Sequence, residues 1–319
     1  MNFQSLKEGL FKARKERNAL PRYLARRFLF APFEKLGLHI TGDHFYEPIP
    51  NLREIEANYD GSPRPIPGHD LQLAQFEDAH AARIDRYGPE FTEAVRAFGF
   101  ELVNYYFRGA DALSYYCLLR ETKPDSVVEI GQGSSTRVAL AALERNAIET
   151  GRAASFVSID PYTRLLGAEL KPEHTRFEQL HLPLQQVPVD ELLARCEGNA
   201  LLFVDSSHVY KHGSDVWHLM HQVYPRLPVG CAVHVHDVVL PYPWLKEFYL
   251  QQKWFWNEQD MLESFLAFNT AFKITLPVYW LHRDSAVVRQ AVGRVAGDLP
   301  QRDDGYSFYL QRINPALRP

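Results

Sequence analysis

The sequence predicts an α/β protein with a mostly parallel, doubly wound sheet of seven strands, helices on both faces, and a helical and extended N-terminal extension. Short apolar, β-branched runs alternate with helix-like segments between residues 126 and 236. Nearly continuous apolar strands separated by helices are typical of parallel sheets that are buried on both faces. Two further strand-like runs, 272–277 and 306–313, are typical of edge strands that close such a sheet.

The composition is that of a soluble globular protein. The chain has 319 residues, of which 46% are hydrophobic and 23% charged, enough to bury a large core. The net charge of −4 argues against a protein that binds nucleic acid through its whole surface. The cysteines Cys117, Cys196 and Cys231 form no CxxC pair. They indicate neither a disulfide framework nor a zinc site, and they fit a reducing cytoplasm.

The N-terminus is basic and shows no secretion signal, and no apolar run is long enough to cross a bilayer. We therefore expect a cytoplasmic protein. The simpler interpretation of the basic stretch is one or two surface helices that pack on the body. The alternative is contact with an anionic membrane surface or a polyanionic substrate. The basic side chains are Lys7, Lys12, Arg14, Lys15, Arg17, Arg22, Arg26 and Arg27.

We expect two regions along the chain, an accessory region over residues 1–107 and the α/β domain over 108–319. Residues 1–36 and 70–107 have helix-like patterns, whereas 38–69 hold five prolines and are expected to be extended with turns. The segment "HFYEPIP" (44–50) lies in this arm. It is expected either to cover an acceptor pocket or only to pack on the body.

The predicted domain alternates strands and helices in order. Strands are expected at 126–130, 155–160, within 175–187, at 200–205 and at 230–236, and helices at 135–148, 189–196, 214–227 and 256–269. In open sheets of this kind, ligands bind beyond the carboxyl ends of the strands. Several of these strands end in polar or glycine-rich sequence, which predicts a cleft at that edge.

A glycine pair follows the first strand, in "VVEIGQGSST". Gly131 and Gly133 allow a tight turn and the close approach of a ligand to the backbone. A dinucleotide fingerprint needs a third glycine, but position 136 is Thr, and Glu129 inside the strand also departs from that pattern. The alternative is an ordinary turn between a strand and a helix.

Asp160 ends the second strand, about 30 residues further along the chain. A carboxylate at this place can accept hydrogen bonds from both hydroxyls of a ribose. The alternative is a helix N-cap, because Pro161 suits the first position of a helix. The glycine loop supports the ribose interpretation.

The combination resembles the class I S-adenosylmethionine-dependent methyltransferases over roughly residues 112–313. "EIGQG" is similar to their first motif, and Asp160 stands where their ribose-binding acid lies. The resemblance implies a Rossmann-like fold and S-adenosylmethionine as cofactor. "DSSHVYKHGSDV", "HVHD" and "WNEQDMLESFLAFN" resemble a bacterial branch associated with glycan and natural-product modification. The cofactor-binding residues expected from this resemblance are Glu129, Gly131, Gly133, Ser134, Ser135, Asp160 and Asp205.

Asp205 and His208 follow the fourth strand and are candidates for chemistry. Asp205 at a strand end can face the cofactor ammonium, a metal ion or the substrate hydroxyl. An unperturbed imidazole titrates near neutral pH, so His208 can take a proton from a hydroxyl during methyl transfer. The alternative for His208 is a structural histidine. The predicted catalytic residues are His208, His236 and Asp205.

His236 and Asp237 lie at the end of the fifth strand, where His234 and His236 share one face. In metal-dependent O-methyltransferases, two strand-end carboxylates and a following amide hold magnesium. Here Asp205 and Asp237 supply the carboxylates, but Val238 takes the place of the amide. His236 is the substitute we consider, although imidazole suits softer metals better than magnesium.

The predicted function is O-methylation of a sugar, glycan or natural-product acceptor, with a histidine as general base. The aromatic segment 242–259 suits flat acceptors of this kind, although half of it is expected to be core. Three alternatives stay open: N-methylation on the same fold, a nicotinamide-dependent oxidoreductase, and a non-catalytic cofactor-binding protein. Thr136 argues against the oxidoreductase. We expect a small-molecule or glycan partner, a divalent cation as a second cofactor, and an oligomer as an open option.

Overall fold

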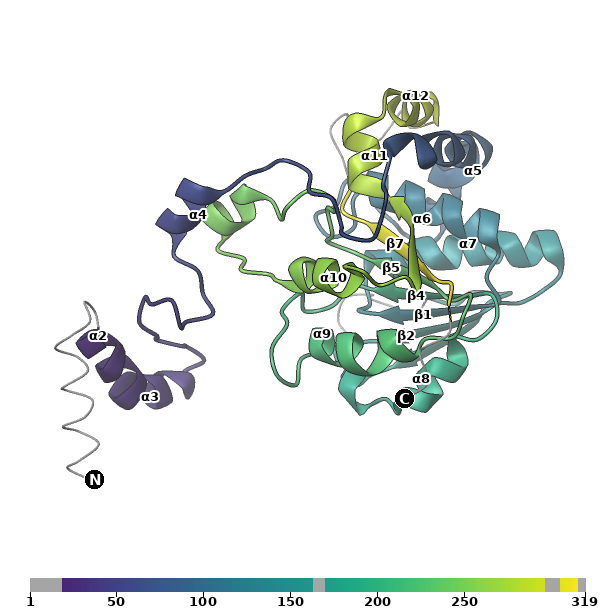
Figure 1. Ribbon diagram of the computed structural model, residues 1–319. Helices are drawn as coiled ribbons and strands as arrows, with labels where there is room; N and C mark the ends of the chain where they lie inside the picture. The colour runs from purple at the N-terminus through teal and green to yellow at the C-terminus, as the bar shows by residue number, and fades with distance from the viewer. Residues whose placement is uncertain (1–18, 163–169, 296–304, 315–319) are drawn as a thin grey trace. The chain divides into compact units, whose positions relative to one another are not determined.

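The computed structural model describes residues 19–162, 170–295 and 305–314 (Figure 1). These residues fall into two compact units. The N-terminal unit holds the described residues up to Gly61 together with Leu245–Phe255, and the sheet unit holds Ser62–Trp244 together with the described residues from Trp256 onward. The expected boundary after residue 107 lies inside the sheet unit.

The N-terminal unit consists of short helical segments joined by extended chain. The segments are α2 (Ala19–Leu24), η1 (Ala25–Leu29), α3 (Phe30–Glu34), α4 (Leu52–Asn58) and η6 (Phe248–Gln252). The helix α4 interrupts the arm expected to be extended, and its N-cap is Asn51, whose side chain accepts a hydrogen bond from the Arg53 amide. Arg26 pairs with Glu47 at 2.6 Å. The basic residues up to Arg17 lie outside the described residues.

The sheet unit contains seven strands in the order β3-β2-β1-β4-β5-β7-β6. Their bounds are β1 (Ser126–Ile130), β2 (Ser155–Ile159), β3 (Arg176–Leu180), β4 (Ala200–Val204), β5 (Ala232–Val235), β6 (Phe272–Pro277) and β7 (Phe308–Arg312). The first five strands pair in parallel, and β7 inserts antiparallel between β5 and β6. The mostly parallel, seven-stranded, doubly wound sheet that the sequence predicts is confirmed.

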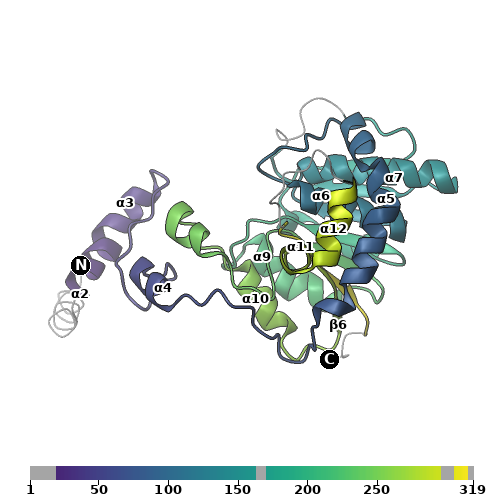
Figure 2. The same cartoon turned by 90° about the horizontal axis from the view of Figure 1, so that it is seen from above.

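Helices cover both faces of the sheet (Figures 1 and 2). One face carries α5 (Glu77–Ala97), α6 (Gly109–Thr122), α7 (Ser134–Thr150), α11 (Val278–Asp284) and α12 (Ala286–Val295). The other carries α8 (Val189–Arg195), α9 (Asp215–His218) with its continuation through Arg226, and α10 (Glu258–Leu266). The sequence analysis did not predict α6, α11 or α12. In the part of the chain that the structure describes, no helix has the length and apolar character that a bilayer crossing requires.

Apolar burial explains why the strands form where they do. Every residue of β4 is buried, and Val127, Val128 and Ile130 of β1 are buried beside them. Fully burying a side chain of this kind contributes about 1.5–3 kcal/mol. The sheet is therefore a rigid support, and its polar strand ends are held in place by the apolar interior behind them.

A buried polar cluster joins three helices on the α5 face. His80 of α5 and His282 of α11 face each other through their Nε2 atoms at 3.3 Å, and Ser114 Oγ of α6 lies 3.3 and 3.4 Å from the same two atoms. Burial lowers the pKa of His282 to about 4, although Asp111 opposes this shift. Burial also lowers the pKa of His80, aided by His282 and Arg83. Both rings are therefore neutral at neutral pH.

This cluster predicts that acid destabilises the fold. His282 has a lower pKa in the folded protein than in the unfolded chain, so the unfolded chain binds its proton first as the pH falls. Its contribution is complete above about pH 6.5, and about 3 kcal/mol is lost as the pH falls to about 4. Urea unfolding across this pH range should show that the free energy of unfolding falls less for His282→Gln than for the parent. The exposed His174→Gln is the control, and identical pH dependence in all three proteins would contradict the assignment.

Candidate active site

The glycine loop after β1 is shaped by a close approach to the end of β4. Gly131 has a φ of +86°, and a Cβ built there would lie 2.0 Å from the carbonyl oxygen of Asp205. The Asp205 amide in turn donates to the carbonyl of Ile130 at 2.8 Å. Only glycine fits at position 131, because both the backbone conformation and the space exclude a side chain. A Cβ on Gly133 would meet no atom within 4 Å.

Glu129 lies beneath this loop, fully buried. Its carboxylate accepts hydrogen bonds from Ser135 Oγ at 2.8 Å, Thr136 Oγ1 at 2.7 Å and Ser158 Oγ at 2.6 Å. Burial raises the pKa of Glu129 to about 7, and the three hydroxyls oppose that shift. These contacts tie the first turn of α7 to β1 and β2, so the carboxylate supports the loop from inside. The hydroxyl protons of Ser135 and Thr136 are therefore donated to Glu129.

Asp160 follows β2 and faces the same loop. Its Oδ2 accepts a hydrogen bond from the Gln132 amide at 2.8 Å, and its Oδ1 accepts one from the Tyr162 amide at 2.5 Å. The residue is 8% exposed. Each oxygen keeps a second lone pair for a ligand hydroxyl. The competing helix N-cap interpretation depends on residues 163–169, which lie outside the described residues.

A cavity of about 310 Å³ opens between the glycine loop and the segment before α6. It is lined on one side by Gln132, Gly133, Ser134 and Ser135, together with Asp205. Its other wall is the loop from Gly99 to Phe107, which Asn104 holds through hydrogen bonds to backbone atoms of Glu101, Tyr106 and Phe107. The cavity combines backbone amides, hydroxyls and aromatic rings, as small-molecule sites do.

His208 reaches the strand ends from the loop after β4. Its Nε2 lies 3.3 Å from Asp205 Oδ1 and 3.4 Å from Asp237 Oδ2, and its Nδ1 lies 2.9 Å from Glu258 Oε2. Burial alone would lower the pKa of His208, but the three carboxylates outweigh it and raise the pKa to about 10. His208 and Asp237 both have left-handed backbone, with φ of +58° and +55°. Such conformations are uncommon in non-glycine residues and often occur at functional sites.

The N-terminus of α10 holds the His208 loop in place. The amides of Asn257 and Glu258 both donate to the His208 carbonyl at 3.1 Å. Glu258 Oε2 also accepts a hydrogen bond from Ser206 Oγ at 2.8 Å, and Asn257 Oδ1 accepts one from the Tyr210 amide at 2.6 Å. The ring of Trp256 lies 4.3 Å from the His208 ring, between centroids. The His208 ring therefore has little freedom to rotate.

His236 lies on the other side of Asp205, with 2% of its surface exposed. Its Nδ1 is 3.5 Å from Asp205 Oδ1 and 3.8 Å from Asp237 Oδ1, and its Nε2 is 3.5 Å from Asp111 Oδ2. Burial opposes protonation, but Asp237, Asp205 and Asp111 raise the pKa of His236 well above its ordinary value. The pKa of Asp205 is lowered, because the two histidines outweigh the effect of its burial.

Two carboxylates that contact His208 and His236 were not predicted from the sequence. Asp111 comes from α6 and Glu258 from α10, and both are almost completely buried. Glu258 lies in "WNEQDMLESFLAFN", which we singled out only for its resemblance. Asp111 stands in a segment with no motif, and its only signal is an acidic residue in the first turn of an apolar helix. His234 is structural: its Nε2 contacts Ser307 Oγ at 2.8 Å, and its ring stacks on Tyr309.

The donor atoms at the strand ends fit a cation. One ligand atom each from Asp205, His208 and Asp237 lie within 4.8 Å of one another. The carboxylates offer hard oxygen ligands, and both nitrogen atoms of His236 lack a hydrogen-bond partner among the described residues. Val238 takes no part, because its amide donates to the Tyr306 carbonyl and its side chain is buried.

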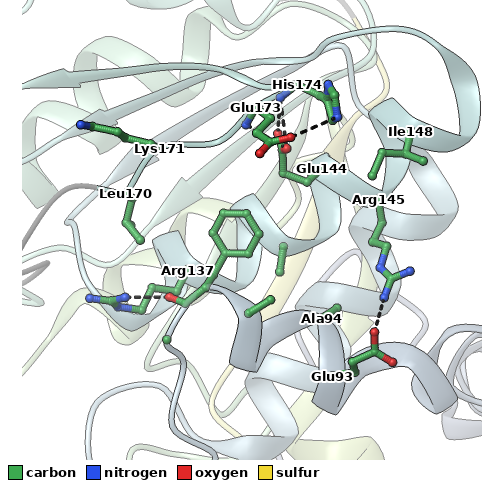
Figure 3. Close-up of a pocket in the computed structure, with 14 residues that line it drawn as sticks. Glu93, Ala94, Arg137, Glu144, Arg145, Ile148, Leu170, Lys171, Glu173 and His174 are labelled. Atoms are coloured by element: carbon green, nitrogen blue, oxygen red, sulfur yellow. Dashed lines mark hydrogen bonds and ion pairs between the residues drawn. The ribbon is translucent and has the colours of Figure 1, made fainter.

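A second pocket, of about 560 Å³, lies between α5, α7 and residues 170–174 (Figure 3). Several of its charged side chains contact one another or backbone atoms. Arg145 pairs with Glu93 at 3.1 Å, and Glu144 accepts hydrogen bonds from the amides of Glu173 and His174. None of the predicted site residues lines this pocket. The candidate site is therefore the cavity at the strand ends.

Comparison with known proteins identifies a domain within the sheet unit. Residues 128–238, which run from β1 past the end of β5, match a family model described as a methyltransferase domain. These residues therefore form a methyltransferase domain. No curated protein matches it.

Several solved structures are similar to the chain. They include an S-adenosylhomocysteine-bound methyltransferase, PaMTH1, from Podospora anserina, with 16% identity, a TM-score of 0.42, and coverage of 77% of this chain and 100% of that one. CalS11, a TDP-rhamnose 3'-O-methyltransferase of calicheamicin biosynthesis, has 15% identity and a TM-score of 0.36, with coverage of 76% and 99%. The Mg–SAM form of CmcI has 15% identity and a TM-score of 0.35, with coverage of 66% and 77%.

The two loop glycines should respond differently to the same substitution. Gly131→Ala forces a Cβ against the Asp205 carbonyl. We therefore expect the free energy of unfolding to fall by about 1–3 kcal/mol or more. Gly133→Ala meets no atom and should unfold like the parent, but its methyl group enters the cavity and should weaken binding of S-adenosylhomocysteine. Thermal unfolding and calorimetric titration test both effects. Equal stability of the two variants would show that the loop does not approach Asp205 in this way.

Proposed function

We propose that this methyltransferase transfers a methyl group from S-adenosylmethionine to a hydroxyl oxygen of a sugar, glycan or natural-product acceptor. The observation that carries the proposal is the contact of His208 with Asp205 and Asp237, because Asp205 also lines the cavity beside the glycine loop. An amine that arrives neutral needs no base. A hydroxyl must lose a proton as its oxygen attacks, and a general base beside the cofactor meets that need.

The cofactor is proposed to lie along the glycine loop. The partly exposed backbone at Gly131 and Gly133 would pass beside its methionine part, and Gly133 and Ser134 line the cavity. Asp160 would accept hydrogen bonds from the ribose hydroxyls with the lone pairs that Gln132 and Tyr162 leave free. Glu129 would contribute by holding the loop rigid from inside. Alignment of the methyl group with the acceptor oxygen then supplies much of the rate enhancement.

His208 is the proposed general base, and Glu258 is its positioning residue. The contact between Nδ1 and Glu258 leaves Nε2 directed at the strand ends, where the acceptor oxygen would lie. The surrounding carboxylates keep His208 protonated in the protein alone, because they raise its pKa to about 10. A divalent cation on Asp205 and Asp237 would cancel much of that negative field and make Nε2 available to accept a proton.

A divalent cation is accordingly part of the proposal, held by Asp205, Asp237 and His236. When bound, such an ion polarises an acceptor oxygen and favours its deprotonation. The protein contributes the donor atoms and the surrounding carboxylates. Flat aromatic groups near the site, Tyr106 at the cavity and Trp256 against His208, suit the apolar face of a sugar or an aromatic acceptor.

Cofactor binding tests the first part of the proposal. S-adenosylhomocysteine should bind and raise the melting temperature, whereas NAD should not. Asp160→Asn should weaken S-adenosylhomocysteine binding by about 10–100-fold, the range that losing charge-assisted hydrogen bonds produces. Asp125→Asn, an exposed carboxylate before the amino end of β1, is the matched control. Equal affinity in parent and Asp160→Asn would remove the ribose assignment.

Proton removal is tested by single-turnover methyl transfer. His208→Ala should lower the rate by about 10²–10⁴-fold, with little change in cofactor affinity. Glu258→Gln should lower it less, because the imidazole stays but is poorly oriented. His212→Ala, an exposed histidine in the same loop, is expected to behave like the parent. A His208→Ala protein that turns over normally would assign proton removal to another group, and one that neither folds nor binds cofactor would make His208 structural.

A further inference from the structure

Beside His208, the strand-end carboxylates Asp205 and Asp237 face a second imidazole, that of His236, which also contacts a carboxylate outside the site. His236 follows β5, and its ring packs against Phe107 with centroids 5.0 Å apart. One ring nitrogen, Nδ1, faces the carboxylates of Asp205 and Asp237. The other, Nε2, faces away from them, toward Asp111 on α6.

Asp111 is a buried carboxylate with one satisfied and one unsatisfied oxygen. Its Oδ1 accepts a hydrogen bond from the Tyr306 amide at 2.7 Å, which fixes the side chain. Its Oδ2 has no hydrogen-bond partner among the described residues and lies 3.5 Å from His236 Nε2. A buried carboxylate without a partner is costly, and an Nε2 proton on His236 would face this oxygen.

We infer that Asp111 is a positioning residue that keeps the His236 proton on Nε2, so that Nδ1 is a cation ligand and the site takes a transition-metal ion in preference to Mg²⁺. The inference rests on the cation of the proposed function. A carboxylate on the far nitrogen of a metal-binding histidine is a common outer partner, because it sets the tautomer and ring orientation. Mg²⁺ prefers oxygen ligands, whereas imidazole suits Mn²⁺, Co²⁺ and their neighbours better.

The geometry explains why His236 is suited to this role. Asp205 and Asp237 supply one carboxylate oxygen each, on the side of the ring where Nδ1 lies, and the side chain of Asp205 is 33% exposed at the cavity. An ion can therefore reach the carboxylates from the cavity, while the His236 ring behind them is 3% exposed. Nδ1 is buried without a hydrogen-bond partner among the described residues, as expected of an atom reserved for a ligand.

The test is direct metal binding to the full chain, read from the visible absorption of Co²⁺ and from calorimetry with Co²⁺, Mn²⁺ and Mg²⁺. The parent should bind Co²⁺ more tightly than Mg²⁺, by about tenfold or more, with an absorption spectrum that reports a nitrogen ligand. Asp111→Asn should weaken Co²⁺ binding by about 10–100-fold and leave S-adenosylhomocysteine affinity unchanged. Glu121→Gln, a partly exposed carboxylate on the same helix, is the matched control and should bind Co²⁺ like the parent.

A double variant tests the inference through a change in metal preference, which a general loss of metal affinity would not produce. In the double variant Asp111→Asn with His236→Glu, three carboxylates face the ion, so the preference should move toward Mg²⁺. If Asp111→Asn does not fold, His236→Gln is the second variant. It removes the proposed nitrogen ligand itself and should also lower Co²⁺ affinity. Equal binding of Mg²⁺ and Co²⁺ by the parent, or unchanged Co²⁺ affinity in Asp111→Asn, would overturn the inference.

Two parallel measurements separate this inference from the proposed function. A parent protein that binds S-adenosylhomocysteine and transfers methyl groups in excess chelator, yet binds no Co²⁺, would overturn the metal inference and leave methyl transfer standing. A parent that binds Co²⁺ as described but does not bind S-adenosylhomocysteine would leave the metal inference standing and overturn the proposed cofactor site.

Discussion

Parallel pairing of β1, β4 and β5 is the constraint on which the site depends. Ile130 lies opposite Val204, and Val204 lies opposite Val235, so the three strands end at one edge of the sheet. The residues that follow them, Gly131, Asp205 and His236, are brought together by this register alone. A shift of one residue in β4 would turn its side chains to the other face and separate these groups.

Charge at this edge is concentrated and mutually compensated. Removing a charge from water costs several kcal/mol in a protein unless a partner and hydrogen bonds offset it. His208 and His236 each face carboxylates on both sides of their rings, and those carboxylates come from different elements. The sheet therefore supplies Asp205 and His236, while α6 and α10 supply the outer partners. The orientation of each imidazole therefore depends on the packing of these helices against the sheet.

The sequence predicted the strands better than the carboxylates that contact the two histidines from neighbouring helices. Strands such as 126–130 and 272–277 are apolar runs bounded by turns, and local pattern is enough to place them. The strand-end positions of Asp205 and Asp237 follow from the same pattern. Asp111 and Glu258 are different, because each acts through a partner more than 40 residues away along the chain, and no local signal marks such a contact. Glu129 stays a predicted cofactor-site residue, and the contacts of its carboxylate with three hydroxyls beneath the loop are not visible in the local sequence pattern.

The antiparallel strand β7 has a consequence for how the domain is made. Residues 308–312 form β7 between β5 and β6, and Tyr306, two residues before the strand, donates its amide to Asp111 while its carbonyl accepts from Val238. During synthesis, β5 leaves the ribosome about 70 residues before its neighbour β7. Contacts of such long sequence separation form slowly, because the loop must close before they contribute. The edge of β5 therefore stays open while the intervening chain is made, and the histidine–carboxylate cluster can reach its final form only after β7 has been added. A nascent chain halted before residue 306 would hold the glycine loop without a finished reaction centre.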